Sequence, residues 1–554
     1  MDTDDDLFDF VIVGAGVAGC VLASRISHRR PDLRVLLIEA GVQKDERTSG
    51  AMAFAGGFDS DLEWNYRSVP QERAFGGDTV CLTSGKIIGG GSGVNYQVFT
   101  RGPAIDYDEW ADLVHDERWS WNGMLAYFKK AEMWYPSVEM KEKGLVTADS
   151  HGDSGPIKVS HATNSGKPRN YPLRKKIREF HELLGRKRVD DINNGQQLGY
   201  SEAFNSTYEG LRSFASSYPL GSNVTLWTES VVERLIMKGK TAEGVIVIRN
   251  GTRVRVRARR EVILSAGAQG SPKILLLSGI GPTTELDRYN ITPVADLPVG
   301  KGYTDHPNIF TYWTIDDPNV TMGDGEMETP QVHWLAGLPY DWISFAPADE
   351  KAHKMAEQTL NPTVFDRYAA DGKMQVENFV LYACVDTSTR KNPLQGWPGK
   401  RVLSLMHILV DPVSRGTLTL SSADPDDAPV LDPKLLASPV DRLALYENVR
   451  ETARAIQAVE GLNAVEFGVD DSLRDNWSDE ALDIRANRSG GSVFHCSGSC
   501  AMGEAVDTDC KVLELEKLRV VDASVIPLPL AAHYQAPCYA IAEQAADMIL
   551  SSIA

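Results

Sequence analysis

The chain has 554 residues, of which 42% are hydrophobic, and its formal net charge is −19. A chain of this length can bury a large core and hold several domains. Its negative charge argues against nucleic acid or an anionic membrane surface as a partner, because neither would be attracted to it. No apolar run approaches the roughly 18 residues that a membrane-spanning helix needs, so we expect no membrane span.

Two features bear on the compartment of the protein. Triplets of the N-glycosylation type are more frequent than chance predicts, because random placement of this composition would give about two or three. They begin at Asn205, Asn223, Asn250, Asn290, Asn319, Asn476 and Asn487. The first residues, MDTDDD, are acidic, whereas a secretory signal starts with basic and then apolar residues. The sequence leaves open a secreted enzyme whose signal is missing here and a cytosolic enzyme whose triplets are never glycosylated.

Cysteine is sparse and odd in number. The seven cysteines are Cys20, Cys81, Cys384, Cys496, Cys500, Cys510 and Cys538. The closest two, Cys496 and Cys500, have no second pair at the spacing of a zinc site. We therefore predict packed or free thiols and no metal site.

Residues 10–40 predict a dinucleotide-binding unit. An apolar run leads into a glycine turn, a stretch with helical spacing and a second apolar run, which is the order strand, turn, helix, strand. Gly14 allows the tight turn, Gly16 lets the backbone approach a pyrophosphate, and Gly19 lets the helix lie close to the sheet. The helix N-terminus attracts phosphate. Glu39, about 20 residues past Gly19, suits a hydrogen bond from a ribose 2′-OH and disfavours NADP.

A second stretch rich in Gly and Ser begins near residue 83, after a polar and aromatic segment. Such a loop lets the backbone approach a flat or charged group closely. The stretch GKIIGGGSGVNYQVFTRGPAIDYD resembles the first signature of the glucose-methanol-choline (GMC) oxidoreductases, flavoproteins that bind FAD. The resemblance implies that this loop and the segment before it cover the isoalloxazine ring and the pyrophosphate. The implied contacts are Trp64, Gly89, Gly90, Ser92 and Asn95.

Some members of that family attach the flavin covalently through a histidine directly before this asparagine. Val94 stands at that position. We therefore predict that FAD is held noncovalently.

The middle of the chain carries the second signature. A basic amphipathic helix over residues 173–184 should present a solvated face, and alternating segments from Val224 predict a hairpin-rich sheet. The resemblance places a backbone group of Val232 on the adenine. Residues 267–281 fit the second GMC signature, and we predict a short helix with Ser271 as N-cap and Pro272 as its first residue.

The segment VGKGYTDHP resembles the family's VGxNLxDH stretch. We expect Asp305 and His306 to be structural hydrogen bonders. From 311 to 474 the strand-like runs and the helix over 440–459 suit an α+β module, which the resemblance makes the substrate domain. Its large aromatic residues are candidates for a pocket wall. These are Trp334, Trp342, Tyr382 and Trp397.

Two histidines near the C-terminus are the catalytic candidates. His495 matches the histidine that lies at the flavin face in the family, although HCSGS replaces the usual HPxGT. His533 matches a second histidine or asparagine, and AHYQAP is most similar to the aryl-alcohol oxidase branch. We expect His495 to be the base and His533 to orient the hydroxyl and share the proton. Further implied cofactor contacts are Asp522, Ala523, Gln535 and Pro537, of which Pro537 should open a helix whose dipole faces the flavin.

The expected fold is an α/β FAD-binding domain, Rossmann-like and of the GMC type, with an interleaved α+β substrate-binding domain. We assign residues 1–155, 206–310 and 475–554 to the FAD domain and residues 156–205 and 311–474 to the substrate domain. The resemblance implies oxidation of a primary or secondary alcohol, aromatic, allylic or of natural-product type, by proton abstraction and hydride transfer to flavin N5. Reoxidation by O2, a quinone or another acceptor stays open, as does the oligomeric state. The alternative is a nonredox lyase, dehydratase, cyclase or isomerase that retains FAD.

Overall fold

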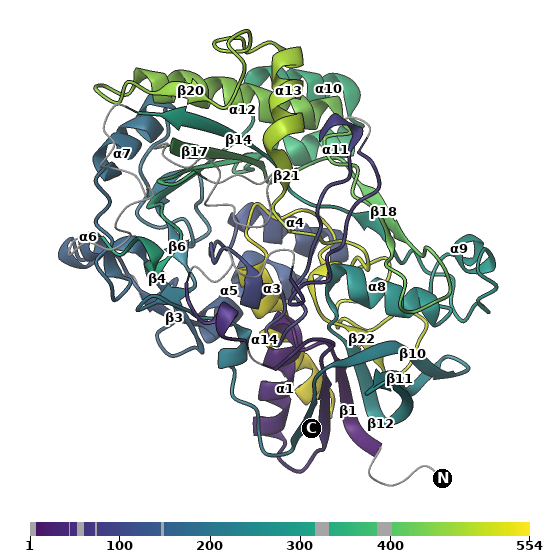
Figure 1. Ribbon diagram of the computed structural model, residues 1–554. Coiled ribbons are helices and arrows are strands. Elements are labelled where there is room, and N and C mark those ends of the chain that lie inside the picture. Colours follow the sequence, from purple (N-terminus) through teal and green to yellow (C-terminus); the bar gives the residue numbers. More distant parts are fainter. Residues whose placement is uncertain are drawn as a thin grey trace.

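The computed structural model describes residues 7–43, 45–51, 60–71, 75–145, 149–315, 332–384 and 402–553. These residues form two modules, each built on a large sheet. The first sheet lies in the lower half of Figure 1 with the C-terminal helix, and the second sheet lies in the upper half under its covering helices. The mixed architecture confirms the predicted fold class.

The first strand shows why the N-terminal segment forms a buried parallel sheet. Six of the seven residues of β1 (Leu7–Val13) are buried, which is typical of a strand covered on both faces. β1 pairs in parallel with β2 (Val35–Ile38) and with β12 (Thr252–Leu264), and helix α1 (Val17–Arg29) connects β1 to β2. The predicted order of strand, turn, helix and strand is confirmed.

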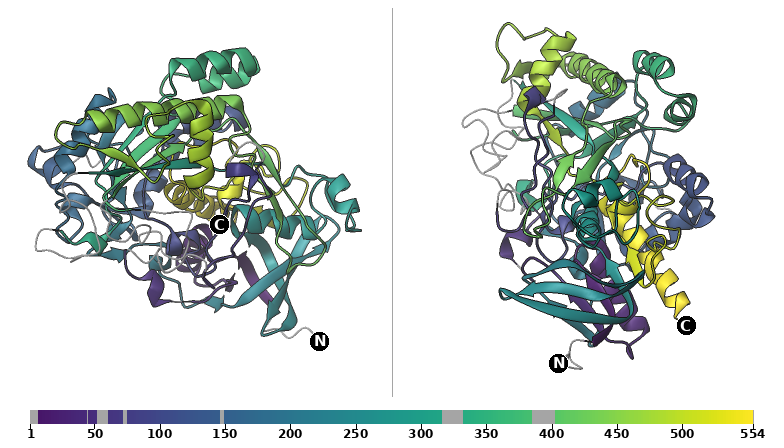
Figure 2. Two further views of the ribbon diagram at one scale, coloured as in Figure 1. Left: turned by 45° about the horizontal axis from the view of Figure 1, so that its top comes forward. Right: turned by 90° about the vertical axis from the view of Figure 1, so that its right-hand side faces the viewer.

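The rest of the first sheet combines two kinds of pairing. Its order among the described residues is β10-β11-β12-β1-β2-β9, with β22 against β12. β9 pairs in parallel with β2 and β22 in parallel with β12. In contrast, β10, β11 and β12 form the predicted antiparallel hairpins, seen at the base of the right-hand view in Figure 2. The bounds are β9 (Val224–Trp227), β10 (Ser230–Lys238), β11 (Thr241–Arg249) and β22 (Leu518–Val520).

Two glycines allow the turn after β1 and the close approach of α1. Gly14 has φ +95°, and a Cβ on it would lie 2.4 Å from the carbonyl oxygen of Ser265. A Cβ on Gly19 would lie 1.8 Å from the carbonyl oxygen of Gly14. No side chain fits at either position, so both glycines have the predicted structural roles.

Helix α8 (Gly267–Leu277) starts earlier than predicted, so Ser271 is not its N-cap and Pro272 is not its first residue. The physical reason lies far along the chain. Pro272 has no N–H to donate to the carbonyl oxygen of Ala268, and the hydroxyl of Ser499 donates to that oxygen at 2.6 Å instead. The helix therefore runs through the proline without a buried, unpaired carbonyl.

The second sheet is antiparallel and has the order β20-β14-β17-β16-β15-β5 among the described residues, with β21 against β14. Helix α12 (Pro439–Ala458), close to its predicted bounds, packs against β16 and β17. The strand bounds are β5 (Gly199–Glu202), β14 (Pro307–Thr314), β15 (Trp342–Ala346), β16 (Val376–Leu381), β17 (Val402–Leu409), β20 (Val465–Phe467) and β21 (Gly490–Ser492).

The strand pairing shows which segments of the chain build the second sheet. β5, from the 156–205 segment, lies in this sheet. β14 begins at Pro307 and β21 ends at Ser492, so this sheet extends beyond the proposed boundaries at 310 and 474. The short loop between β21 and the first C-terminal histidine therefore leads directly from one module to the other.

The remaining elements are short strands and peripheral helices. The strands are β3 (Glu132–Tyr135), β4 (Ile157–His161), β6 (Phe204–Asn205), β7 (Thr207–Tyr208), β8 (Leu211–Arg212), β13 (Lys301–Tyr303), β18 (Gly416–Thr419) and β19 (Val430–Asp432). The helices are α3 (Gly91–Val94), α4 (Ala104–Val114), α5 (Trp121–Ala131), α6 (Val138–Glu142), α7 (Arg174–Leu183), α9 (Thr283–Asp287), α10 (Glu350–Thr359), α11 (Pro362–Tyr368), α13 (Asp479–Ser489) and α14 (Gln535–Ser552).

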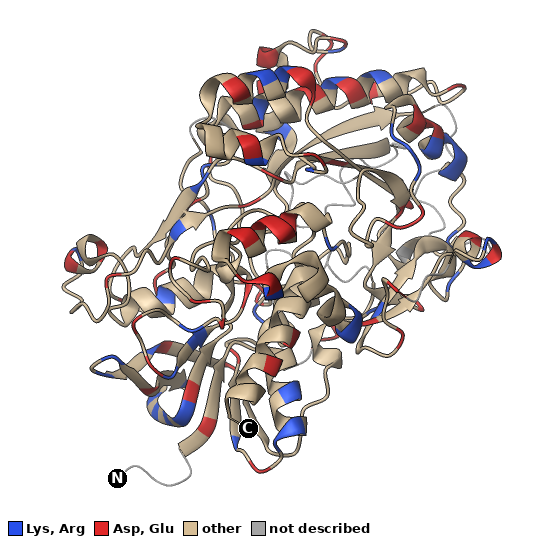
Figure 3. Cartoon of the chain, turned by 180° about the vertical axis from the view of Figure 1, so that it is seen from behind, with Lys and Arg blue, Asp and Glu red and all other residues tan. Residues whose placement is uncertain are grey.

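Charged residues of both signs are spread over the outer helices (Figure 3). Helix α7 is the predicted basic helix, but Arg174 differs from its neighbours because it pairs with Glu202 and Asp341. Over the described residues, no helix has both the length and the apolar character that crossing a membrane requires. None of the seven cysteines, all of them among the described residues, forms a disulfide, and all but Cys538 are buried.

Candidate active site

A cavity of about 770 Å³ is lined by residues of both modules. The lining comes from the turn after β1, the loop before and through α3, strand β10, the start of α8, the second sheet and the C-terminal segment. This volume is in the range of pockets that hold small molecules. Most of the predicted cofactor contacts line it, namely Gly14, Gly16, Glu39, Trp64, Gly90, Ser92, Asn95, Val232, Asp522, Ala523 and Gln535.

Two bare backbones face each other on the cavity wall. Gly90 has φ +53°, and a Cβ on it would lie 2.8 Å from the Cα of Gly16. A Cβ on Gly16 would lie at ordinary contact distance, 3.9 Å from the Gly90 Cα and the Ser265 carbonyl oxygen, so packing within the chain does not require glycine there. Helix α1 starts at this point, and a helix N-terminus attracts phosphate. The site therefore fits the diphosphate of a dinucleotide cofactor.

Glu39 and the start of β10 lie together on the wall. The N–H of Ser230 donates to the Glu39 carbonyl at 2.9 Å. The Glu39 carboxylate accepts hydrogen bonds from the N–H groups of Ala15 (2.9 Å) and Gly41 (2.8 Å). Burial raises the pKa of Glu39 to about 7 despite these bonds. Each carboxylate oxygen has a further lone pair, so the expected bond from a ribose hydroxyl stays available.

Three of the predicted cofactor positions are not among the residues that line the cavity. Gly19 packs α1 on the sheet, as described above. The N–H of Gly89 donates to the Ala15 carbonyl at 2.7 Å, and a Cβ on Gly89 would lie 2.6 Å from the Phe214 ring. Gly89 therefore links the loop before α3 to the turn after β1, outside the cavity lining. Pro537 lies in the first turn of α14, which begins two residues earlier, at Gln535. Gln535 reaches the cavity in its place.

The α3 loop is tied to the start of α14. The side-chain amide of Asn95 donates to Gln535 Oε1 at 2.6 Å. Arg212, which the sequence did not single out, donates from one guanidinium nitrogen to the Asn95 side chain (2.7 Å) and backbone (2.8 Å) and to the Ser92 carbonyl (3.0 Å). Burial lowers the pKa of Arg212 to about 9. A buried cation therefore lies directly behind the predicted flavin loop.

Asp522 organises the other side of the cavity. Its Oδ2 accepts from the Gly267 N–H (2.9 Å) and the Ser271 hydroxyl (2.6 Å), and its Oδ1 accepts from the N–H (2.9 Å) and hydroxyl (2.5 Å) of Ser524. Burial raises the pKa of Asp522. The carboxyl group joins the second signature to the C-terminal segment, which places Ala523 on the cavity wall.

The two predicted catalytic histidines lie together on the cavity wall. The ring centroids of His495 and His533 are 4.7 Å apart, and the ring planes are nearly perpendicular at 80°. Both residues line the cavity. His495 follows Phe494, whose φ of +64° turns the chain between β21 and the histidine. The structure thus brings together two side chains that are separated by a strand, a loop and a turn in the sequence.

Asp305 holds the backbone around His495. Its Oδ1 accepts from the N–H groups of His306 (2.7 Å) and His495 (2.8 Å), and its Oδ2 accepts from the Ser492 hydroxyl. Burial raises the pKa of Asp305 to about 6. The Nδ1 atoms of His306 and His495 lie 3.0 Å apart, within hydrogen-bond distance. Asp305 and His306 are therefore the structural hydrogen bonders that the sequence predicted.

Cys496, where HCSGS departs from the usual pattern, belongs to the same network. Its sulfur accepts from the Tyr303 hydroxyl at 3.0 Å and lies 3.4 Å from Asp305 Oδ2. Burial raises the pKa of the thiol, which makes a thiolate nucleophile unfavourable here. Cys496, which stands where the family usually has proline, therefore supplies a hydrogen-bonding group that supports the loop around His495.

Glu377 on β16 is the site residue that the sequence analysis missed. Its Oε1 lies 2.9 Å from His533 Nε2, and its side chain is fully buried. The Thr100 hydroxyl accepts from the His533 N–H at 2.9 Å and fixes the backbone of the histidine. The only signal in the sequence was a single acidic residue at the start of an otherwise apolar strand. Such a residue does not show which histidine it will contact in the fold.

The two histidines have different surroundings. Burial lowers the pKa of His495 well below its usual value, and positive charge on His533 or His306 would lower it further. A neutral imidazole has one nitrogen that accepts and one that donates, so His495 can accept a proton from a substrate hydroxyl. The ring of His533 instead contacts a carboxylate.

Strand register arranges side chains on one face of the second sheet in two rows. Glu377 and Asn308 lie opposite one residue of β17 and form a polar row. Phe379 and Phe310 lie opposite Met406 and form an apolar row beyond it. The Oδ1 of Asn308 is buried and has no hydrogen-bond partner among the described residues. In the polar row Glu377 contacts His533 and Asn308 lines the cavity, and the apolar row continues the cavity wall.

This wall replaces the predicted one. Trp334, Trp342 and Tyr382 lie in a separate buried cluster and do not line the cavity, so their assignment to the pocket wall was wrong. In β16, successive side chains alternate between faces, and Tyr382 belongs with the face that packs away from the cavity. Trp397 lies outside the described residues.

The glycine cradle, Glu39 and the histidine pair together fit an oxidoreductase with a dinucleotide cofactor. The chain belongs to the GMC oxidoreductase family, whose models match residues 8–308 and 412–542. Members of this family bind FAD, and the cradle fits its diphosphate.

Individual proteins are similar over the whole length. GMC-type oxidoreductase acuG from Aspergillus aculeatus is 34% identical over 98% of this chain and 99% of its own. A formate oxidase crystal structure superposes with a TM-score of 0.87 at 27% identity and covers 99% of both chains. A fungal aryl-alcohol oxidase structure has a TM-score of 0.81 at 25% identity, again over 99% of both chains. The chain is an enzyme, an FAD-dependent alcohol oxidase or dehydrogenase of this family.

Proposed function

We propose that the enzyme oxidises the alcohol carbon of an apolar alcohol to a carbonyl with His495 and His533 as its proton-handling pair. The observation that carries the proposal is the histidine pair on the wall of the cofactor cavity, with one ring bonded to buried Glu377. When bound, FAD supplies the hydride acceptor.

The two histidines divide the work on the substrate hydroxyl. An alcohol loses hydride readily only if its O–H proton leaves in or before the same step, because a protonated carbonyl is a poor product. His495, neutral and without a carboxylate at its ring, accepts that proton. His533 orients the hydroxyl and shares the positive charge, which Glu377 stabilises. Such general-base help is worth about 10² to 10⁴ in rate.

The row of Phe310, Phe379 and Met406 supports an aromatic, allylic or natural-product alcohol as substrate. These side chains offer apolar contact to the body of the molecule, while the hydroxyl lies at the polar row. The free amide oxygen of Asn308 offers one acceptor to a second polar group of the substrate. A sugar, with hydroxyls on every side, would leave several of them unpaired against this wall.

We also propose that FAD binds noncovalently. Val94 lines the cavity at the position where some family members carry the histidine that bonds the flavin. A valine side chain has no group to form that bond. After acid precipitation, all yellow colour should remain in the supernatant, and colour retained in the pellet would contradict this.

The test is an anaerobic absorbance spectrum of the holoenzyme mixed with benzylic, allylic, aliphatic and sugar alcohols, followed by air. Bleaching of the flavin band by an apolar alcohol supports oxidation, and the speed of recolouring in air separates O2 from another acceptor. Turnover without bleaching would favour the nonredox alternative.

Substitutions assign the roles. His495→Ala should abolish flavin reduction with FAD still bound, and His533→Ala should slow it strongly. His181→Leu is the control, because His181 is buried, has no hydrogen-bond partner among the described residues and lies outside the cavity. Reduction of His495→Ala at the native rate would refute its role as base.

A further inference from the structure

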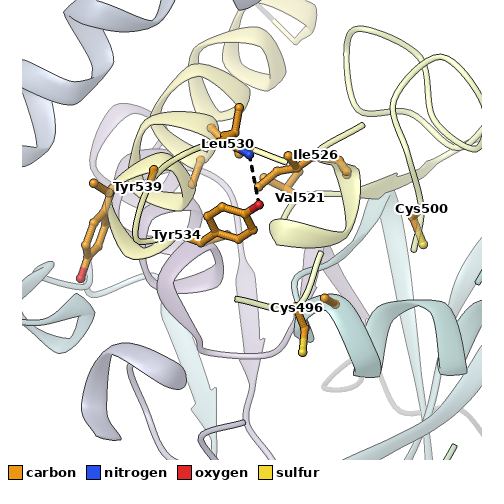
Figure 4. Packing of buried hydrophobic residues seen from close by; sticks show 14 of the residues in the cluster. Cys496, Cys500, Val521, Ile526, Leu530, Tyr534 and Tyr539 are labelled. Atoms are coloured by element: carbon orange, nitrogen blue, oxygen red, sulfur yellow. Dashed lines mark hydrogen bonds between the residues drawn. The ribbon is translucent and has the colours of Figure 1, made fainter. Parts of the chain in front are cut away.

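Behind His495 lies a chain of hydrogen bonds that the reaction does not use directly. His495 Nδ1 lies 3.0 Å from His306 Nδ1, and His306 Nε2 lies 3.3 Å from the Tyr534 hydroxyl. The Leu530 N–H donates to that hydroxyl at 3.2 Å, drawn as the dashed line in Figure 4. Leu530 and Tyr534 belong to the segment just before α14, of which Tyr534 is the N-cap. The chain thus starts at a backbone group and ends at the proposed base.

The bond between two imidazole nitrogens couples the tautomers of the two rings. One Nδ1 must carry the proton and the other must offer its lone pair. Because a neutral imidazole carries a single N–H, this choice also decides what each Nε2 does. His306 is neutral: burial lowers its pKa to about 3, the charges of His533 and Arg415 act in the same direction, and Asp411 opposes them.

The chain can run in two directions. In one, His495 Nδ1–H donates to His306, whose Nε2–H donates to Tyr534, and His495 Nε2 keeps its lone pair. In the other, Tyr534 donates to His306, His306 donates to His495, and His495 presents an N–H at Nε2. The second direction would make His495 a donor to the substrate and remove it as a base.

Ser497 is an available partner for Tyr534 in both directions. Its hydroxyl is buried and has no hydrogen bond among the described residues, and it is close enough to lower the pKa of Tyr534. A phenol oxygen accepts up to two hydrogen bonds and donates one. With the Leu530 N–H in one accepting position, Tyr534 either accepts from His306 and donates to Ser497, or accepts from Ser497 and donates to His306.

We propose that His306 and Tyr534 are positioning residues that hold His495 in the tautomer with its proton on Nδ1, so that Nε2 faces the substrate as an acceptor. This rests on the proposed function, which needs a lone pair on His495. The direction of the chain is then Nδ1–H of His495 to His306, Nε2–H of His306 to Tyr534, and O–H of Tyr534 to Ser497. In this arrangement a residue that never touches the substrate decides whether the base is competent.

The direct test is ¹⁵N NMR of the FAD-loaded protein labelled only in histidine. Protonated and bare imidazole nitrogens have very different ¹⁵N shifts, and the absent signals of a His495→Gln variant identify those of His495. The expected result is a protonated Nδ1 and a bare Nε2 in His495. A protonated Nε2 would overturn the proposal. This readout needs no substrate, so it is independent of the alcohol test of the proposed function.

Variants test the coupling. His306→Asn keeps an amide oxygen near the position of Nδ1 and should preserve the His495 tautomer, whereas His306→Leu and Tyr534→Phe should let both tautomers coexist. If the two tautomers are equally populated, only half of the enzyme has a competent base, and the rate of flavin reduction falls about twofold. Loss of the ring alignment lowers the rate further, to about one tenth of the native rate, which equals 1.4 kcal/mol.

Folding is followed separately through FAD content and thermal unfolding, with His181→Leu as the buried-histidine control. A His306→Leu protein that binds FAD and keeps a single Nδ1-protonated His495 would overturn the role of His306. A merely structural role would lower the stability of His306→Leu and His306→Asn alike and leave the tautomer signals of His495 unchanged.

Discussion

Replacing Glu377 by Gln tests how the site handles the proton. The amide oxygen of Gln can still accept from His533 Nε2–H, now 2.9 Å from Glu377 Oε1, so the geometry of the pair is kept and only the negative charge is lost. Glu377 is fully buried, so solvent does not screen this charge. The perturbation therefore acts on the positive charge that develops on the histidines when the hydroxyl proton leaves.

The magnitude follows from the difference between two kinds of hydrogen bond. A bond to a charged group contributes about 1.5–3 kcal/mol and a neutral one about 0.5–1.5 kcal/mol, which leaves about 1–2 kcal/mol for the charge. Since about 1.4 kcal/mol is tenfold in rate, flavin reduction should slow about 5- to 30-fold in Glu377→Gln. FAD content should not change, because Glu377 is not among the residues that line the cavity.

The assay is anaerobic stopped-flow reduction of bound FAD by an alcohol that bleaches the wild type. Glu285→Gln is the matched control: Glu285 is buried and bonded to Arg288 and to the Leu420 N–H on the first module's periphery, so its loss should leave the reduction rate unchanged. A Glu377→Gln enzyme that binds FAD and reduces it at the native rate would refute this account of His533.

Three further predictions concern cofactor binding, stability and loop position. Gly16→Ala should fold with an unchanged apo melting temperature but bind FAD at least about tenfold more weakly, because the new methyl group clashes with nothing in the chain yet lies at the diphosphate cradle. Equilibrium dialysis measures the affinity, and Gly50→Ala is the control. His151→Leu should cost about 3–5 kcal/mol of unfolding free energy in denaturant titration, because the buried ring joins Glu132 and Asp191. The stability that these contacts contribute to the wild type should depend on pH. It should decrease as the pH falls below the usual carboxyl pKa, because the pKa values of Glu132 and Asp191 are lowered in the folded protein. It should also decrease as the pH rises above 6.5 and through the raised pKa of His151. Asp106→Asn should slow flavin reduction severalfold without loss of FAD, because Asp106 bonds Lys373 and the Ala531 N–H that precedes His533.

Local pattern was enough to predict the nucleotide-binding start of the chain. The apolar runs of β1 and β2 and the glycine spacing between them depend on neighbours within one supersecondary unit, so the periodicity of the sequence reports them directly. The same holds for α7 and α12, whose observed bounds lie within about two residues of the predicted ones. The proposed catalytic positions, His495 and His533, came only from the family motifs around them.

Contacts between distant segments explain the misses. Nothing near Pro272 in the sequence shows that Ser499 will satisfy the carbonyl that the proline leaves free, so the start of α8 could not be placed. The alternation of β16 separates Phe379 and Leu381 from Tyr382, but periodicity alone does not say which face meets the cavity. Size and aromaticity favoured Tyr382, and the fold placed it on the other face.

The asymmetry between the two histidines has a consequence for where the proton rests. No carboxylate contacts the ring of His495 within the described structure, and Asp305 holds only its backbone N–H. A protonated His495 is therefore an uncompensated buried cation beside His306, which is itself held neutral by burial. His533 has the carboxylate of Glu377 2.9 Å from its far nitrogen, and this carboxylate would stabilise a positive charge that develops on the ring. The proposed base and the carboxylate that would stabilise the charge thus lie on different rings. A hydroxyl placed against both rings can give its proton to His495 while the charge is shared toward His533 and Glu377, and such a division keeps His495 neutral and ready between turnovers.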